Sequence, residues 1–291
     1  MDLDMNFSLN KKQISEYNKN GYLVINNVIE PTVIDKLKNE INKLVEESRN
    51  IKKSDHIYDL AESHSKKNLK VRRIKQPQNI NSKFKYFLKN KQIIDKVSSL
   101  IGKNIRLHGG KINLKSPSAG DPVDWHQDWA FYPHTNDNVL AVGVMLDDMT
   151  LDNGTVLFIP ESHKKEIYNH HKDGFFAGAI DVNKENIDTN AAIKVTGKAG
   201  SITIHHARLV HASKPNHSNT MRRFLLWEFA ATDAWPLMGF DGYESFNKKI
   251  ITGKSINTPR LENVPVRIPL PPAVFQGSIF ENQRIIKNKN L

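Results

Sequence analysis

With 291 residues, of which 38% are hydrophobic and 25% charged, the chain can bury a sizeable core, and this composition excludes a disordered protein. It has no cysteine, which excludes disulfides and thiolate metal sites, and no apolar run of about eighteen residues, so we expect no membrane span. The formal net charge of +11 comes mainly from scattered lysines without interleaved aromatic residues, so no nucleic-acid partner is expected. Without cysteine or a visible secretory signal, a cytoplasmic location is expected.

The N-terminal part is predicted to contain two helices around one strand. Lys11–Lys19 is polar and helical in pattern, Gly21 ends this helix, and Tyr22–Ile25 is an apolar strand. Pro31 suits the first turn of the next helix because its φ is already fixed near the helical value. Apolar residues then recur every three or four positions up to Val45, which predicts an amphipathic helix.

A loop and a second pair of helices are expected next. Residues 50–69 are polar, rich in lysine and without a clear period, which is typical of a loop. Apolar residues at helical spacing between Phe84 and Ile101 predict two helices that end at Gly102. We therefore expect residues 1–104 to form a helical support for the rest of the chain.

Short strands separated by turn residues dominate residues 105–230. Val139–Leu146 is continuously apolar, as in a strand covered on both faces, and Thr155–Ile159 and Arg222–Phe229 have the same texture. Repeated short strands over such a length predict a barrel or jelly roll. The proline-rich residues 231–291 are expected to wrap over it. No linker or repeat interrupts the pattern, so we predict a single domain.

One tripeptide and a distant histidine indicate a metal site. His126 and Asp128 stand two positions apart, so on an extended strand their side chains project from the same face. Together with His211 they supply two imidazoles and one carboxylate, the set that holds non-haem Fe(II) and leaves coordination positions open. Because these residues are far apart in sequence, two different strands must bring them together.

A single arginine follows the second histidine at a suggestive distance. The turn-forming segment Pro215–Asn219 separates His211 from Arg222 and predicts a hairpin, which would place the guanidinium on the neighbouring strand. A planar guanidinium binds a carboxylate with two hydrogen bonds, so a keto acid that also chelates iron would suit both groups. The alternative is an ion pair between Arg222 and Glu228; the adjacent Arg223 should point the opposite way.

Several motifs in residues 12–230 resemble those of the phytanoyl-CoA dioxygenase family, which are Fe(II)- and 2-oxoglutarate-dependent oxygenases. They are Trp125–Trp129 around His-Gln-Asp, Asn153–Pro160 with Ser162–Lys164, His206–His211 with the distal histidine, Asn113–Pro117, and the opening Gly21–Ile25.

The resemblance implies a mainly β fold, a double-stranded β-helix (jelly-roll, cupin-like) core with N-terminal helices. It also implies Fe(II), 2-oxoglutarate and O₂ as cofactors, with the iron on His126, Asp128 and His211, and 2-oxoglutarate on Arg222. The implied reaction is hydroxylation of an aliphatic C–H bond, with release of succinate and CO₂. Related halogenases have a small residue in place of the metal carboxylate; the presence of Asp128 favours oxygenation.

Further residues are expected near the cosubstrate. Lys115 matches a family lysine that approaches it, and His170 matches another position near the pocket. Gln127 is a third candidate, although its place between the ligands also suits packing. Glu161 departs from the family, which usually has glycine there, and should matter only to a turn. Candidate substrate contacts are Trp129, Tyr132, Arg72 and Trp235, whereas His163, His205 and His206 are interpreted as structural.

The substrate is expected to be a small, anionic molecule. An acyl-CoA, a free carboxylic or amino acid and an organophosphonate all remain open, because no motif marks the substrate pocket. The competing hypotheses are a nucleic-acid dealkylase with the same iron chemistry and a non-catalytic binding protein on this fold. The dealkylase is disfavoured because its paired arginine motif lies further beyond the distal histidine. Hydroxylation is not distinguished from desaturation or cyclisation, and the oligomeric state is not predicted.

Overall fold

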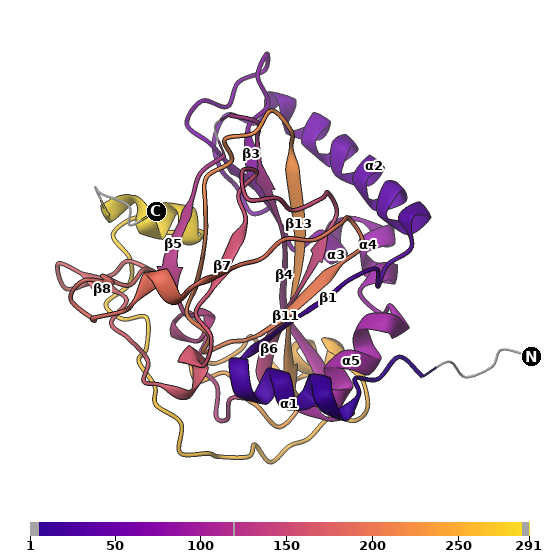
Figure 1. Ribbon diagram of the computed structural model, residues 1–291, viewed down its shortest axis with the longest axis vertical. Helices are drawn as coiled ribbons and strands as arrows, with labels where there is room; N and C mark the ends of the chain where they lie inside the picture. The colour runs from indigo at the N-terminus through magenta and orange to yellow at the C-terminus, as the bar shows by residue number, and fades with distance from the viewer. Residues whose placement is uncertain (1–5, 119, 287–290) are drawn as a thin grey trace, which may run out of the picture.

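Two β-sheets that share a cavity form the body of the protein (Figure 1). The computed structural model describes residues 6–118, 120–286 and 291. The larger sheet has the order β1 (Tyr22–Ile25), β11 (Ile202–His206), β6 (Val139–Met145), β13 (Arg222–Ala231), β4 (Ile105–Lys115), β3 (Val71–Lys75) and β2 (Tyr58–Leu60), with β14 (Ile250–Thr252) beside β4. The smaller sheet has the order β10 (Ile193–Lys194), β7 (Val156–Phe158), β12 (His211–Ser213) and β5 (Val123–His126). This confirms the jelly roll.

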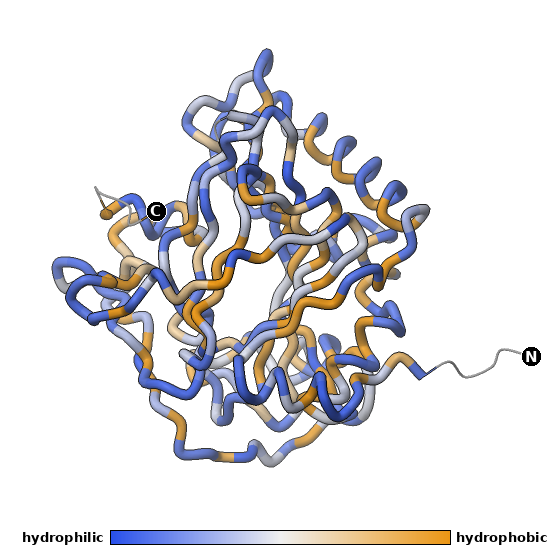
Figure 2. Tube along the Cα trace, viewed as in Figure 1, coloured by the Kyte–Doolittle hydropathy of each residue, from blue (hydrophilic) through white to orange (hydrophobic). Residues whose placement is uncertain are grey.

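Helices cover the outer face of the larger sheet (Figure 1). They are α1 (Lys11–Asn20), α2 (Pro31–Glu47), α3 (Pro77–Ile80), α4 (Ser82–Phe87) and α5 (Lys91–Ile101). Ile41 of α2 and Val97 of α5 are fully buried in one cluster with Ile74 and Ile112 of the sheet. Burial of this apolar area is what attaches the helices to the strands. Accordingly, orange apolar segments gather in the strands and blue polar segments in the outer loops (Figure 2).

The first helix has clear sequence reasons for its limits. Asn10 and Gln13 form a reciprocal capping box at its start, with the Asn10 side chain accepting from the Gln13 backbone N–H at 2.9 Å. Gly21 ends it in the left-handed conformation at φ 83°. Both α1 and α2 therefore confirm the predicted helices. None of the helices among the described residues has the length and apolar character needed to cross a membrane.

The remaining short elements connect the sheets. The hairpin of β8 (His171–Lys172) and β9 (Phe175–Phe176) projects from the body, and α6 (Tyr243–Lys248) and α7 (Ile279–Asn282) interrupt the C-terminal wrap. Single 3-10 turns are η1 (Ser48–Asn50), η2 (Asp128–Ala130), η3 (Ser162–Lys164), η4 (Thr189–Ala191) and η5 (Gln283–Ile285). The wrap returns along the body so that α7 lies near β5 (Figure 1).

Part of the predicted division of the chain is wrong. Residues 50–69 were expected to be a loop, yet they contain β2, and β3 follows directly. Strands β1, β2 and β3 all extend the larger sheet, so this sheet is not confined to residues 105–230. The lysines and arginines around β2 and β3 hid the alternation, because their charged side chains do not read as strand residues. Residues 1–5, 119 and 287–290 of the predicted single domain lie outside the described residues.

The predicted hairpin between His211 and Arg222 is also wrong. Strand β12 pairs with β5 and β7 in the smaller sheet, whereas β13 pairs with β4 and β6 in the larger one. The segment from Pro215 to Asn219 therefore crosses from one sheet to the other. Turn residues between two strands do not reveal whether the strands pair or face each other across a cavity. Here they face each other, which still brings both residues to one site.

Candidate active site

Three ligand-type side chains meet where the smaller sheet lines the cavity. His126 ends β5 and is the direct cross-strand partner of His211, which begins β12. Asp128 lies just beyond the strand, as the first residue of η2, so the expectation that both ligands stand on one strand is only half correct. Gln127 between them is extended, which keeps the two side chains on the same side.

The distances between these groups suit one metal ion. Asp128 Oδ1 is 3.8 Å from His126 Nε2 and 4.0 Å from His211 Nε2. One ligand atom from each residue lies within 4.8 Å of the other two, and all three residues are buried. An ion at the centre of such a triangle lies about 2 Å from each atom, which is the usual metal–ligand distance. This convergence of donors fits a small divalent cation.

Backbone carbonyls set the orientation of both imidazoles. The Nδ1–H of His126 donates to the carbonyl of Asp124 at 2.8 Å, and that of His211 donates to the carbonyl of Leu209 at 2.9 Å. Each bond fixes the tautomer that leaves Nε2 with a free lone pair toward the centre of the triad. Burial lowers the pKa of His126 well below its ordinary value and that of His211 to about 4. Both rings are thus neutral ligands at pH 7.

The carboxylate of the triad is kept ionised by its neighbours. Burial alone raises the pKa of Asp128, but the positive charge of Lys111 and the nearby His211 and His205 outweigh it and hold the pKa well below its usual range. His205 Nε2 lies 3.3 Å from Asp128 Oδ2. His205, interpreted from the sequence as structural, thus lies against the triad and supports its carboxylate. Alternation along β11, which places His205 and His206 on opposite faces, was the signal that could have found it.

A cavity of about 450 Å³ opens beside the triad. It lies between the two sheets, with the triad on one side and inward-facing residues of β3, β4 and β13 on the other. Side chains from the larger sheet that line it are Arg73, Lys75, Lys111, Asn113, Arg222, Phe224, Leu226 and Glu228. Side chains two residues apart on a strand point to the same face. These residues of β3, β4 and β13 therefore all lie on one face of the larger sheet.

Arg222 is a buried guanidinium that lines this cavity. Its side chain is almost fully buried; Nη2 donates to the carbonyl of Gly154 at 2.7 Å, and Nε has no hydrogen-bond partner. No ion pair to Arg222 occurs within the described ranges, and burial lowers its pKa to about 10. The alternative pairing with Glu228 is excluded, because Glu228 binds Lys111 at 2.6 Å. A buried cation without a counter-ion favours an anionic ligand.

Gly154 supports this arginine and has no room for a side chain. Its φ is +91°, and a Cβ there would lie 2.4 Å from Cδ of Lys115. We expect Gly154→Ala to lower the free energy of unfolding by about 3 kcal/mol, from left-handed strain plus overpacking. The matched control is Gly174→Ala, which has φ +83° but no neighbour within 4 Å; it should cost only about 1 kcal/mol. Equal effects in both variants would refute the packing argument.

Lys115 does not take the place expected for a cosubstrate contact. Its buried Nζ donates to the carbonyls of Asp121 at 2.8 Å, Ser213 at 3.3 Å and Lys214. The side chain does not line the cavity. Three carbonyl acceptors satisfy an ammonium group, so the structure gives Lys115 the role of tying β4 to the segment after β12.

Gln127 and His170 are likewise occupied in supporting the triad from behind. The Gln127 backbone N–H donates to His170 Nε2 at 2.9 Å, and the Gln127 side chain donates to the carbonyl of Arg208 at 2.8 Å and accepts from the Tyr168 N–H. Neither side chain lines the cavity. Neither residue takes the expected place beside the cosubstrate. His170 instead holds the backbone of Gln127, and the Gln127 side chain packs behind the triad, as the alternative interpretation of Gln127 predicted.

Of the aromatic candidates for substrate contact, only one lines the cavity. Tyr132 does, and burial together with the nearby charge of Asp128 raises the pKa of its phenol well above the ordinary value. Trp129 is buried elsewhere and donates through Nε1 to the carbonyl of Pro265 at 3.0 Å. Trp235 packs edge-on against Phe246 near α6, outside the cavity lining. Trp129 is a core residue and Trp235 is half-buried in an aromatic group outside the cavity, which corrects their expected role.

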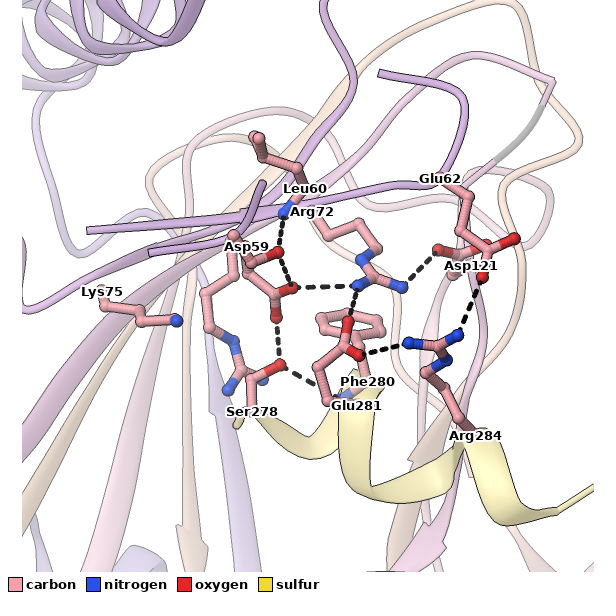
Figure 3. A network of polar contacts seen from close by, with 12 residues as sticks. Asp59, Leu60, Glu62, Arg72, Lys75, Asp121, Ser278, Phe280, Glu281 and Arg284 are labelled. Atoms are coloured by element: carbon pink, nitrogen blue, oxygen red, sulfur yellow. Dashed lines mark hydrogen bonds and ion pairs between the residues drawn. The ribbon is translucent and has the colours of Figure 1, made fainter. Parts of the chain in front are cut away.

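Arg72 also has a structural position rather than the expected substrate contact. Figure 3 shows it between Asp59, Glu281 of α7 and Asp121, with the Asp59 carboxylate 3.0 Å and the Asp121 carboxylate 3.6 Å away. Asp59 also accepts from Ser278. These contacts attach the C-terminal α7 to β2 and β3. Three carboxylates leave no positive charge for a substrate.

Loss of this arginine should destabilise the fold. The side chain of Asp59 is fully buried, so Arg72→Met leaves a buried carboxylate without its cation. We expect a decrease of about 3 kcal/mol in the free energy of unfolding, measured by urea denaturation. Adding Asp59→Asn should restore part of it, because the double variant no longer buries an unpaired charge. Strictly additive losses would contradict a direct Arg72–Asp59 interaction.

Glu161 bears out the interpretation of its motif. Its φ is 65°, in the left-handed region where glycine is preferred, and it begins the turn η3 outside the triad. The departure from the family therefore concerns a turn.

The site as a whole is a cavity in a jelly roll, with a His-Asp-His cation site on one sheet and an unpaired buried arginine on the other. That combination defines the class of iron oxygenases that use a keto acid as cosubstrate.

The chain belongs to the phytanoyl-CoA dioxygenase (PhyH) family, whose model matches residues 17–224. A "probable alpha-ketoglutarate-dependent hypophosphite dioxygenase" of Stutzerimonas stutzeri is 35% identical over 282 residues, which cover 96% of this chain and 98% of that protein. An ectoine dioxygenase of Bordetella bronchiseptica is 20% identical over 72% of each. The crystal structure of EctD from S. alaskensis with bound Fe has the same fold, with a TM-score of 0.68 at 16% identity over 91% of each chain. This chain is thus an α-ketoglutarate (2-oxoglutarate)-dependent dioxygenase.

Proposed function

We propose that the protein oxidises a small phosphorus oxyanion, with hypophosphite as the first candidate. The observation that carries this proposal is the cavity, where a His-Asp-His triad faces a buried arginine and two further cations, Arg73 and Lys75, while Lys111 is paired with Glu228. The similarity to the hypophosphite dioxygenase relative extends over nearly the full length of both chains. Of the substrate classes left open by the sequence, the phosphorus compounds suit both observations.

Each residue has a definite task in this proposal. His126, Asp128 and His211 would hold Fe(II), because their donor atoms converge and both rings present neutral Nε2. Arg222 would bind the distal carboxylate of 2-oxoglutarate, the anion that its unpaired guanidinium requires. When bound, these cofactors supply oxidative chemistry that converts O₂ and 2-oxoglutarate to succinate and CO₂ while one oxygen atom enters the substrate.

The protein itself supplies orientation and a dry surface. Phe224, Leu226 and Val156 line the cavity and keep water from the reacting groups. His205 holds the Asp128 carboxylate in place, and Tyr132 lines the cavity beside them. For hypophosphite, one P–H bond would become P–OH, giving phosphite and leaving phosphorus two oxidation levels higher, with 2-oxoglutarate and O₂ as the co-reactants.

The test is a substrate screen with purified enzyme, Fe(II) and 2-oxoglutarate. Hypophosphite, phosphite, methylphosphonate, carboxylic acids, amino acids and an alkylated oligonucleotide are compared for stimulated succinate release, and products for a mass gain of one oxygen. We expect hypophosphite to give the highest kcat/KM and phosphite as product. Stronger stimulation by a carboxylic acid, an amino acid or the oligonucleotide would overturn the proposed substrate, while leaving the oxygenase class intact.

A further inference from the structure

A second buried arginine faces the cavity on the larger sheet. Arg73 of β3 is 8% exposed and lines the cavity, and its cross-strand partner is Asn113 of β4. Its Nε–H donates to Asn113 Oδ1 at 2.9 Å. We propose that Arg73 and Asn113 together bind the anionic group of the substrate, an inference that rests on the proposed function.

The two side chains present only donors to the cavity. Within the described part of the chain, Arg73 has no ion pair, and neither of its Nη nitrogens has a hydrogen-bond partner. Asn113 uses its Oδ1 on Arg73, so its Nδ2–H₂ group is left for a ligand. The neighbouring carboxylates are engaged elsewhere: Asp59 with Arg72 and Glu228 with Lys111. A planar fork beside an amide donor matches an anion with two or three oxygens.

The register of the sheet separates this donor pair from Arg222. On β4, Arg222 lies opposite Lys115, and Arg73 lies opposite Asn113, which is two residues before Lys115. Arg222 is on β13 and Arg73 on β3, two strands away. At about 3.3 Å per residue and about 4.8 Å per strand, the two arginine Cα atoms are roughly 12 Å apart. The two guanidinium groups are also held by different partners, that of Arg222 by the Gly154 carbonyl and that of Arg73 by Asn113. Arg222 and Arg73 thus form two anion sites in one cavity, one for the cosubstrate and one for the substrate.

The C-terminal segment limits the size of what Arg73 binds. Gly277, Ser278, Ile279 and Asn282 line the same cavity, and the ring of Phe280 lies 5.3 Å from the Arg73 guanidinium carbon. The Arg72 network holds this segment against β2 and β3, as Figure 3 shows for Ser278 and Glu281. A wall of backbone and short side chains beside the donors favours a compact oxyanion over a long acyl chain.

The experiment compares Arg73→Met, Arg73→Lys and Asn113→Ala with a matched control, Arg106→Met. Arg106 is also a buried arginine, but it packs on Phe246 outside the cavity lining. We expect the KM for hypophosphite to rise roughly 10²-fold in Arg73→Met and about tenfold in Asn113→Ala, since charge-assisted hydrogen bonds contribute more than neutral ones. Arg73→Lys should recover only part of the loss, because the fork is gone. Arg106→Met should leave this KM unchanged.

A binding measurement separates substrate recognition from folding. Under anaerobic conditions with Fe(II) and 2-oxoglutarate, hypophosphite should raise the Tm of wild type and Arg106→Met but not that of Arg73→Met. The increase caused by 2-oxoglutarate itself should persist in all three. A hypophosphite-dependent increase in Arg73→Met equal to that in wild type refutes the inference.

The proposed substrate and the role of Arg73 fail in different ways. If no phosphorus oxyanion stimulates the wild type, the proposed substrate is wrong, and Arg73 is judged with whichever anion of the screen does stimulate. An increased KM for that anion in Arg73→Met supports the inference, and an unchanged KM overturns it. A neutral molecule as the preferred substrate overturns both.

Discussion

Replacing Asp128 or His126 by alanine should abolish 2-oxoglutarate turnover. Each supplies one ligand atom to the triad, and no other His, Asp or Glu joins this group among the described residues. The metal stabilises the transition state by several kcal/mol. Its loss therefore corresponds to a decrease on the order of 10³-fold or more in the rate of succinate formation. Anaerobic titration with Fe(II), followed by Tm, should show a clear increase for wild type and none for either variant.

A histidine outside the site provides the control. His217 is exposed in the segment between β12 and β13, and His217→Ala should retain both Fe(II) binding and turnover. Full succinate formation in the His126→Ala or Asp128→Ala protein would show that the metal is held elsewhere, and the assignment of the triad would fall.

Arg222→Met should weaken 2-oxoglutarate binding without weakening the fold of the free protein. In the ligand-bound enzyme, loss of one partner of a buried charge pair costs about 3–5 kcal/mol, which corresponds to a roughly 10²- to 10⁴-fold higher KM. In the free protein, however, the guanidinium is buried without a counter-ion. Its removal should leave the Tm equal or higher, while the Tm increase caused by 2-oxoglutarate disappears.

The neighbouring arginine should behave in the opposite way. Arg223 points to the other face of β13 and binds Asp147 at 2.9 Å. Arg223→Met should therefore lower the Tm and leave the KM for 2-oxoglutarate unchanged. If Arg222→Met lowered the Tm and preserved the KM, Arg222 would be a structural residue and the cosubstrate would bind elsewhere.

The parts of the site that the sequence predicted are those fixed by local spacing. His126 and Asp128 are two residues apart, and one extended residue between them is enough to align their side chains. The family-like motifs then connected them to His211 and Arg222. Lys115 was misjudged for the opposite reason: two of its three carbonyl partners, Ser213 and Lys214, lie about a hundred positions away, and no pattern along β4 reveals them.

Arg73 shows a different kind of difficulty. The sequence predicts Arg72 as a substrate contact, but the choice between it and the adjacent Arg73 depends on which face of β3 meets the cavity. Val71 and Arg73 share one face, and only the pairing of β3 with β4 establishes that this face points inward. Register between strands from distant parts of a chain comes from tertiary packing, so the sequence does not tell which of the two adjacent arginines lines the cavity.

The division of the site between the two sheets has a consequence for how this protein responds to its cosubstrate. The two histidines of the triad stand on β5 and β12, with Asp128 directly after β5, while Arg222 stands on β13 of the opposite sheet. A molecule that contacts both the triad and Arg222 connects the two sheets, so its affinity depends on the distance between them. Core substitutions far from the cavity that widen or narrow this gap should therefore weaken binding of the cosubstrate. Bound cosubstrate should in turn reduce the motion of the two sheets relative to each other.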